Sequence, residues 1–430
     1  MRSRNLIALF AITGSLTAAA DTFRIEIDYM GPDADGHDHQ PSQLVLDAVI
    51  QMFACQGHTL IIDLDDQIPH TDLLTGDPND DCGNFWNYTG ASNTYRNIRN
   101  QYRDRGAGWH YCIFAHQYRI DNDDFNNGSG CATTSSSGRA NGGDALIVTL
   151  GGFSGQTGTE FEQAATLAHE FGHNLGLSHV GSMDESVVSP YIQILPSVMS
   201  YSYQLRGVRE GLIANGLAPE YALFKNIDYS FGRMCPQNEA SLNELSGTRM
   251  QRVDFNCDDD TSDTGVLQDL GFRGSGMGSN APWCGEADES RTTLNDYNEW
   301  SNISDGAGLV DRGETGDPAA LQELALRELK MPICITYEDH IAFWPPNGLG
   351  GGPELAVEAC ITGQNVYVGP LNIIEAGFCV FPFDSVQQAQ SSSPSRSVYY
   401  ITPGTYNESG TTVLNQRGIW TCNTGTARIQ

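Results

Sequence analysis

Hydrophobic and polar residues alternate with two different periods before residue 180, and these periods predict a layered α/β unit. Residues 23–29 alternate apolar and charged side chains, as a half-buried strand does. Apolar residues then recur at helical spacing from Pro41 to about Cys55, and the apolar run 59–64 predicts a second strand. A strand, a helix and a strand in this order predict a βαβ unit with a parallel pair and a right-handed crossover.

The same two periods organise the following part of the chain. Residues 65–106 form a long polar stretch without a clear period. Residues 109–118 and 145–150 predict strands, and the segment 121–143 predicts a surface loop because it is rich in Asp, Asn, Ser and Gly. A helix is predicted over 157–175, entered from a glycine-rich turn.

The pattern weakens beyond about residue 230. One helix is predicted over 318–330, and the glycine-rich tract 347–353 is the best candidate for a linker. Residues 381–420 combine a short helix, a strand at 398–401 and a PGTYNE turn, and they resemble the first rungs of a right-handed parallel β-helix. We expect an accessory module that docks onto carbohydrate or another surface, with a plain β-rich cap as an equal alternative.

The N-terminal segment has the pattern of a signal peptide. Arg2 and Arg4 precede an apolar run at 6–12, and three alanines at 18–20 end the segment. A membrane anchor is the alternative, but this run and every later apolar run are too short to span a bilayer. We therefore expect a secreted, extracellular protein without a membrane partner.

Cysteine content and charge fit this expectation. Eleven cysteines suit an oxidising compartment, and the simplest interpretation is five disulfides and one unpaired thiol, with the connectivity left open. The formal charge is −30, and loss of residues 1–20 with their two arginines makes it −32, which argues against a nucleic-acid partner. Four sequons would be glycosylated in a eukaryotic secretory pathway: Asn87, Asn127, Asn302 and Asn407.

Residues 169–179, HEFGHNLGLSH, match the pattern HExxHxxGxxH. Histidines at i and i+4 of a helix share one face, so His169 and His173 can present ring nitrogens to one metal. Gly176 lets the chain leave the helix with an unusual backbone conformation, which brings His179 back as a third ligand. Three neutral ligands leave a fourth position for water, which is typical of a catalytic zinc site.

Glu170, beside the first histidine, is suited to be the general base. It can accept the proton of the attacking water and pass it to the leaving amine. The residues therefore predict a Zn²⁺-dependent endopeptidase acting on proteins or peptides. Histidines that are ordinary core or surface residues are the alternative.

The motif resembles that of the metzincin zinc endopeptidases. In that superfamily a tight turn containing methionine follows the zinc motif and lies beneath the metal, and residues 197–201, SVMSY, supply such a segment. The resemblance implies that Met199 forms the apolar floor of the site and that Tyr201 approaches the zinc and stabilises the oxyanion. It also implies that an edge strand within 139–150 binds an extended peptide above the zinc.

The resemblance further implies the fold class: α/β (α+β), with a twisted mixed sheet, an active-site helix and a C-terminal subdomain, followed by the β-rich region. Residues 108–118 (GWHYCIFAHQY) and 195–204 (LPSVMSYSYQ) are nearest to less characterised secreted microbial metallopeptidases. Val180 does not match the residue that marks matrixins, astacins, adamalysins or serralysins. The expected segments are a signal peptide (1–20), a catalytic domain (21–305) with subdomains 21–179 and 180–305, a connecting segment (306–360) and a β-rich module (361–430).

Two other polar clusters suggest metals less strongly. Asp254, Asn256 and Asp258 alternate as Ca²⁺ ligands can, but the glycine and glutamate of an EF-hand are missing, so a solvated acidic loop is favoured. A second cluster is explained by a loop before the Pro41 helix, with a second metal site as the alternative. Its residues are Asp33, Asp35, His37, Asp38 and His39.

Two functions of other classes are alternatives to the endopeptidase. One is a catalytically silent binding or adhesion protein that retains the fold, against which the intact motif argues. The other is a zinc hydrolase of a non-peptide substrate, which the motif alone does not exclude.

Overall fold

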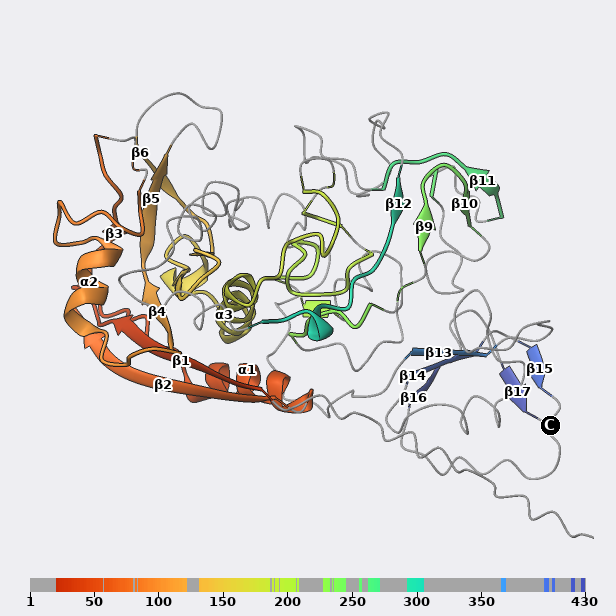
Figure 1. Cartoon of the computed structure of the whole chain (residues 1–430), viewed down its shortest axis with the longest axis horizontal. Coiled ribbons are helices and arrows are strands. Elements are labelled where there is room, and N and C mark those ends of the chain that lie inside the picture. The colour runs from red at the N-terminus through yellow and green to blue at the C-terminus, as the bar shows by residue number, and fades with distance from the viewer. Residues whose placement is uncertain are drawn as a thin grey trace, which may run out of the picture.

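The computed structural model describes the chain from residue 21 onward, with gaps (Figure 1). The described residues are 21–56, 58–79, 82, 84–121, 131–185, 188, 190–192, 194–205, 207–208, 227–232, 234, 236–244, 255–256, 262–270, 292–304, 365–368, 398–401, 404–406, 419–421 and 427–429. The predicted signal peptide, the helix predicted at 318–330 and the linker predicted at 347–353 lie outside these residues.

A five-stranded mixed sheet is the framework of the first half of the chain. Its strand order is β2-β1-β4-β8-β7, in which the first four strands are parallel and β7 runs antiparallel at one edge. The strands span Thr59–Ile68 (β2), Thr22–Met30 (β1), His110–Ala115 (β4), Ala145–Thr149 (β8) and Gly138–Ala140 (β7). The predicted α/β class with a mixed sheet is confirmed.

Helices cover both faces of this sheet. The helices span Gln43–Cys55 (α1), Tyr95–Tyr102 (α2) and Glu160–Asn174 (α3). Alternate side chains of the strands, such as Phe23 and Ile25 of β1, are buried in one core with α1 and α3. Side chains of the opposite face, such as Tyr111 of β4, are buried in a second core with α2. The two-residue period of each strand therefore fills both cores.

The β1-α1-β2 unit has the predicted order with shifted boundaries. The helix begins at Gln43, two residues later than predicted. Ser42 lies at its N-cap without capping it, because the Ser42 hydroxyl donates to Glu160 Oε1 of α3 at 2.5 Å. β2 continues to Ile68, beyond the predicted end, since polar residues in its second half obscure the strand pattern.

The stretch 65–106, whose sequence shows no clear period, contains regular structure. The stretch contains the end of β2, the short strand β3 (Leu73–Leu74) and the whole of α2. Only Tyr95 and Ile98 of α2 are buried, so the apolar period of this helix is too sparse to recognise in the sequence.

The strand predicted over 109–118 is divided between two sheets. After β4 the chain turns at His116 and enters β5 (Gln117–Asp121), which belongs to a three-stranded sheet of order β3-β5-β6. The loop predicted over 121–143 also contains strands, namely β6 (Cys131–Thr134) and β7. In both cases the sequence did not separate short strands from the segments beside them, because their apolar patterns run into one another.

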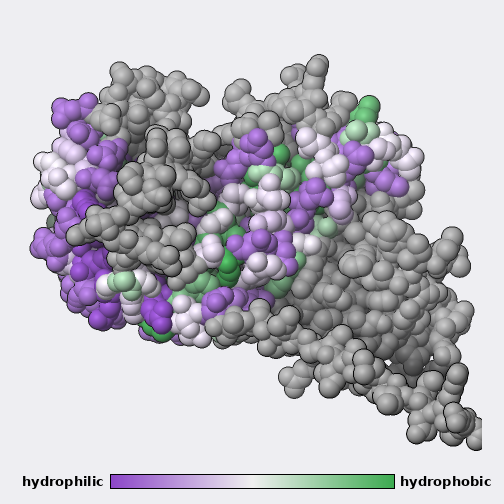
Figure 2. Space-filling model, viewed as in Figure 1, coloured by the Kyte–Doolittle hydropathy of each residue, from purple (hydrophilic) through white to green (hydrophobic). Residues whose placement is uncertain are grey.

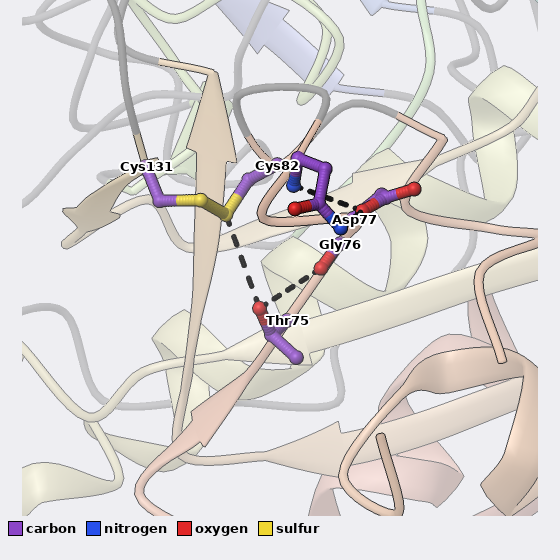
Figure 3. The surroundings of a disulfide bond; sticks show 6 residues. Thr75, Gly76, Asp77, Cys82 and Cys131 are labelled. Atoms are coloured by element: carbon purple, nitrogen blue, oxygen red, sulfur yellow. Dashed lines mark hydrogen bonds between the residues drawn. A yellow bond between two sulfur atoms is a disulfide. The ribbon is translucent and has the colours of Figure 1, made fainter. Parts of the chain in front are cut away.

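A disulfide between Cys82 and Cys131 ties the segment after β3 to the start of β6 (Figure 3). The Cys82 N–H donates to the Asp77 carbonyl oxygen at 2.7 Å, which fixes the loop on that side. Cys112 of β4 is buried and is a free thiol within the described part of the chain. The predicted total of five disulfides stays a prediction.

The remaining elements are short, and all of them except η2, which precedes α3, lie in the second half of the chain. The helical turns are η2 (Ser154–Gln156) and η4 (Glu299–Ser301), and the first strands are β9 (Gln237–Asn238), β10 (Leu242–Asn243), β11 (Thr264–Val266) and β12 (Thr293–Leu294). The last strands are β13 (Asn365–Val368), β14 (Val398–Ile401), β15 (Gly404–Tyr406), β16 (Ile419–Thr421) and β17 (Ala427–Ile429). β14 confirms the strand predicted at 398–401, and all ladders of β13 to β17 are parallel, as they are between rungs of a β-helix. The β-helix and its docking role stay predictions.

The coloured surface in Figure 2 is mostly hydrophilic on the side where α2 and β2 lie in Figure 1. Large apolar side chains with an exposed surface are few among the described residues: Leu44, Ile61 and Leu267. No helix in the described ranges combines the length and apolar character needed to cross a bilayer.

Candidate metal centre

The helix α3 holds the first part of the HExxHxxGxxH motif on a buried face. Its N-terminus is fixed by a capping box, in which Thr159 Oγ1 accepts from the Glu162 N–H at 3.2 Å and Glu162 Oε2 accepts from the Thr159 N–H at 2.7 Å. The helix then packs against the sheet and α1, and His169 and His173 are buried one turn apart. Both imidazoles are therefore held in place by packing.

A Schellman motif ends α3 and redirects the chain. The Leu177 N–H donates to the Gly172 carbonyl oxygen at 2.9 Å, and the Gly176 N–H donates to the His173 carbonyl oxygen at 3.0 Å. Gly176 has φ of 89°, a left-handed conformation that side chains other than glycine adopt at a cost. The predicted departure from the helix at this glycine is confirmed, and it carries the chain to His179.

The three motif histidines converge on one point. The Nε2 atoms of His169, His173 and His179 are separated by 3.1, 3.0 and 3.2 Å, and all three rings are buried. Nitrogen ligands bound tetrahedrally to zinc at about 2.0–2.1 Å would be separated by ~3.3 Å. The residues present therefore fit a zinc ion.

The outer nitrogens of these rings have partners that fix the ring orientation. His169 Nδ1 lies 2.7 Å from the Val198 carbonyl oxygen, and His173 Nδ1 lies 2.9 Å from the Leu177 carbonyl oxygen. His179 Nδ1 lies 3.4 Å from Glu185 Oε1. Backbone carbonyl and carboxylate partners of this kind orient the histidine ligands of metal sites and leave Nε2 free to face the ion.

Burial keeps His169 and His173 neutral. Desolvation, reinforced by the neighbouring imidazoles, holds the pKa of His169 well below its usual value and lowers the pKa of His173 to about 3. Burial alone would raise the pKa of Glu185, but its contact with His179 outweighs burial and lowers the pKa to about 2. Neutral imidazoles with an ionised carboxylate behind them are suited to hold a cation.

Glu170 lies on the same helix and is completely buried. Its carboxylate fills the space above Gly138 of the edge strand β7, where a Cβ atom would lie 2.6 Å from Glu170 Oε1. The predicted general base thus directly follows His169 in the sequence, and its carboxylate lies against the edge strand of the sheet.

The segment around Met199 packs beneath α3. A Cβ atom at Gly172 would overlap Met199 Sδ, so the sulfur lies against the helix where that glycine leaves room. Ser197 begins the turn, with its carbonyl oxygen accepting from the Ser200 N–H at 3.1 Å. The next carbonyl, that of Val198, is the partner of His169. The turn therefore supports the cluster directly.

Tyr201 lies beside the cluster and is buried. Its ring centroid is 4.6 Å from that of His179 and 5.9 Å from that of His169. The structure thus brings together all the residues that the sequence singled out for this site. The predicted edge strand also exists, as β7, and it begins one residue before the expected range 139–150.

The calcium prediction gains no support. Asn256 donates its side-chain amide to Asp263 Oδ2 at 3.2 Å, and within the described residues no group of metal-ligating side chains includes this loop. Asp254 and Asp258 lie outside the described residues.

Sequence reasoning missed three residues that shape the site: Gly138, Glu185 and Glu299. Glu299 of η4 is fully buried, accepts from the Ser230 N–H at 2.7 Å and is hydrogen-bonded to Ser197 at the start of the methionine-containing turn. These residues reach the site through tertiary contacts, and no local sequence spacing reveals them.

Comparison with known proteins bears on the same segment. A model of the metallo-peptidase family M12B reprolysin-like matches residues 68–180, a range that contains Glu170 and the three histidines. The comparisons with curated proteins and with solved structures gave no match. The placement among microbial metallopeptidases stays a prediction. Val180 matched the marker residue of none of the four families considered, whereas the family model favours one family, the reprolysin-like one, over residues 68–180. Over residues 68–180, the chain is similar to the reprolysin-like metallopeptidases of family M12B.

Proposed function

We propose that this protein is a zinc-dependent endopeptidase that hydrolyses peptide bonds in proteins or peptides. The observation that carries the proposal is the convergence of the Nε2 atoms of His169, His173 and His179, at 3.0–3.2 Å from one another. Glu170, the next residue after His169, is buried on the same helix. The similarity of residues 68–180 to M12B metallopeptidases supports the same activity.

The three histidines would hold the ion through Nε2, with their Nδ1 atoms anchored on Val198, Leu177 and Glu185. When bound, zinc lowers the pKa of a water molecule and polarises the carbonyl of the scissile bond. The chain itself supplies orientation, because packing and the partner of each Nδ1 atom fix the rings before any substrate arrives.

Glu170 is the proton carrier of the proposed reaction. Its carboxylate takes a proton from the attacking water and delivers it to the nitrogen of the leaving amine. Burial between α3 and β7 excludes bulk water from this carboxylate and limits its movement. Tyr201, packed against His179, is proposed to donate its hydroxyl proton in a hydrogen bond to the oxyanion of the tetrahedral intermediate.

The edge strand β7 is the proposed binding surface for substrate. It pairs with β8 on one side and ends the five-stranded sheet on the other. An extended peptide can add to such an edge through backbone hydrogen bonds. Because Glu170 lies against Gly138 of this strand, a peptide added there would pass close to the general base.

We also propose that the protein is exported. The pattern of residues 1–20 supports a cleaved signal peptide, and the Cys82–Cys131 disulfide suits an oxidising compartment. Asn87 and Asn302 of the sequons are exposed, as glycosylation would require.

Replacement of Glu170 by Gln tests the proposed mechanism. The amide has nearly the shape of the carboxylate but cannot accept the proton, so we expect kcat for cleavage of a quenched fluorescent peptide to fall by ~10²–10⁴-fold. Zinc content, measured by elemental mass spectrometry, should stay equal to that of the wild type.

Glu160→Gln is the matched control, because it makes the same chemical change on the exposed first turn of the same helix. It should cleave the peptide like the wild type. Full activity of E170Q, or loss of zinc together with activity, would contradict the role of Glu170. A chelator-resistant wild-type activity would contradict the zinc mechanism itself.

A further inference from the structure

A second group of histidines lies away from the HExxHxxGxxH motif, at the carboxyl ends of adjacent parallel strands. His70 follows β2 by two residues, His116 directly follows β4, and His37 and His39 lie in the loop after β1. Since β2, β1 and β4 are neighbours in the sheet, their three ends bring the four imidazoles to one place. Their metal-ligating atoms all lie within 4.8 Å of one another.

The four rings have nearly tetrahedral symmetry. The six separations between their ring centroids range only from 5.1 to 5.5 Å. His116 Nδ1 lies 3.2 Å from His37 Nε2 and 3.3 Å from His39 Nε2. These nitrogen separations equal the ~3.3 Å edge of a tetrahedron whose corners are about 2.0–2.1 Å from a central zinc ion.

Partners on the outer side of the rings fit metal ligation as well. His37 Nδ1 lies 2.9 Å from Asp33 Oδ2, and His70 Nδ1 lies 3.2 Å from the Gly31 carbonyl oxygen. Carboxylate and carbonyl partners on the second nitrogen are the usual companions of metal-bound histidine. The Asp33 side chain also accepts from backbone N–H groups of residues 35, 36 and 37, which fixes the loop that carries His37.

Neutral imidazoles alone do not explain the arrangement. Each neutral ring has a single N–H, so an N–H of His116 shared with His37 or His39 would still leave other lone pairs of the cluster facing one another. His39 and His116 are buried, so water does not reach into the cluster to separate these rings. A cation at the centre satisfies all four lone pairs at once.

We propose that His37, His39, His70 and His116 bind a second zinc ion in a closed, four-coordinate site. Four protein ligands leave no position for water, which distinguishes a structural site from a catalytic one. The near-tetrahedral arrangement selects Zn²⁺ over Cu²⁺ and Ni²⁺, which favour square-planar or tetragonal sites.

The second zinc joins the two sheets of the N-terminal part. His116 is the residue at which the chain passes from β4 of the five-stranded sheet to β5 of the three-stranded sheet. Its carbonyl oxygen accepts from the Gly151 N–H at 2.8 Å, just after β8. The ion therefore clamps the ends of β1, β2 and β4 at the point where the two sheets meet.

The wild-type protein gives the first test, which needs no variant. Elemental mass spectrometry of the full-length secreted protein should find two zinc ions per chain. Anomalous diffraction measured on both sides of the zinc absorption edge should place one of them among the four histidines. A single zinc per chain, an empty centre among these four rings, or copper at that centre would each overturn the proposal.

Two single variants separate this site from the motif. His116→Ala should retain one zinc, held by the HExxHxxGxxH motif, and His173→Ala should retain one zinc, held by the four-histidine cluster. His58→Ala, a partly buried histidine outside both clusters, should retain two. Two zinc ions in H116A would overturn the proposal. If H116A does not fold, the wild-type diffraction measurement decides.

Discussion

Glu170 and Gly138 show how the site depends on single residues far apart in the sequence. The absence of a side chain at Gly138 creates the space that the Glu170 carboxylate occupies. A Cβ atom there would also lie 2.6 Å from the Ile147 carbonyl oxygen, which belongs to the backbone of β8 and cannot move freely. A side chain at position 138 would therefore displace mainly the Glu170 carboxylate.

Gly138→Ala should displace Glu170 without removing any proposed ligand. Because a misplacement of ~1 Å can lower a rate by ~100-fold, we expect kcat to fall by at least ~10-fold while zinc content stays constant. Steady-state kinetics and elemental analysis measure both quantities. Gly106→Ala is the control, since a Cβ atom at Gly106 meets no atom within 4 Å. Equal kcat values for G138A and G106A would refute the positioning argument.

Tyr201 can be examined by removing only its hydroxyl group. Tyr201→Phe keeps the ring contact with His179, so zinc binding and KM should change little, and kcat should fall by ~10–100-fold if the hydroxyl stabilises the oxyanion. Tyr191→Phe is a matched control, because its ring lies 5.3 Å from that of Tyr201. An unchanged kcat in Y201F would leave Tyr201 with a packing role only.

At the scale of elements, the helix α3 and its exit are what the sequence predicts best. Both the apolar period and the capping residues Thr159 and Glu162 are local, and the motif histidines are four and six residues apart. The 109–118 strand was less tractable, because nothing local marks His116 as the residue where one sheet ends and another begins. No local pattern marks β7, because its segment is rich in Gly, Ser and Asn. Its burial comes from contacts with the sheet and with α3, which the local sequence does not show.

Parts of the candidate site were beyond sequence reasoning for the same reason. The motif and the methionine-containing turn are contiguous patterns, so they could be recognised. Gly138 and Glu299 act through contacts with residues more than thirty positions away, namely Glu170 and Ser197. His37 and His39 suggested a second metal site only as an alternative, because His70 and His116 join them through the order of the strands.

The exit from α3 permits a test of backbone conformation alone. A Cβ atom at Gly176 would have room, because Ser304 Oγ would lie 3.5 Å from it. The backbone, however, has φ of 89°, in the left-handed region. Gly176→Ala should therefore lower the free energy of unfolding by ~1–2 kcal/mol in urea titrations, and it should weaken zinc binding through His179. Gly176→Asn should be less destabilising, since asparagine tolerates the left-handed conformation better. Equal stability of G176A and wild type would show that the turn does not depend on glycine.

At the scale of the whole molecule, Glu299 connects the second half of the described chain to the turn beneath the proposed zinc. Burial raises its pKa to about 8, even though hydrogen bonds with Ser197 and Ser230 act in the opposite direction. The folded protein therefore keeps this carboxyl protonated at neutral pH, whereas the unfolded chain releases the proton near pH 4.5. Folding thus becomes linked to pH through one buried group.

The sign of this linkage is a prediction. Between about pH 4.5 and 8 the folded state binds a proton that the unfolded state has lost, so the free energy of unfolding should decrease as pH rises across this window. The loss amounts to ~3–5 kcal/mol at most and stops above the folded-state pKa. Glu299→Gln should flatten this dependence in urea titrations at several pH values, and Glu160→Gln should not. If the free energy of unfolding of the wild type rose from pH 5 to 8 in parallel with that of E299Q, the linkage would be contradicted.

Cys112 lies on β4, in the middle of the five-stranded sheet, and desolvation, followed by the nearby charge of Glu170, raises the pKa of its thiol well above the usual value. Alkylating reagents attack thiolates, so they can modify this residue only when the central strand opens. The rate of Cys112 alkylation, measured on the peptide that contains this residue, would then report the rate at which the sheet opens. This measurement would use the native protein, without any introduced dye or reporter residue.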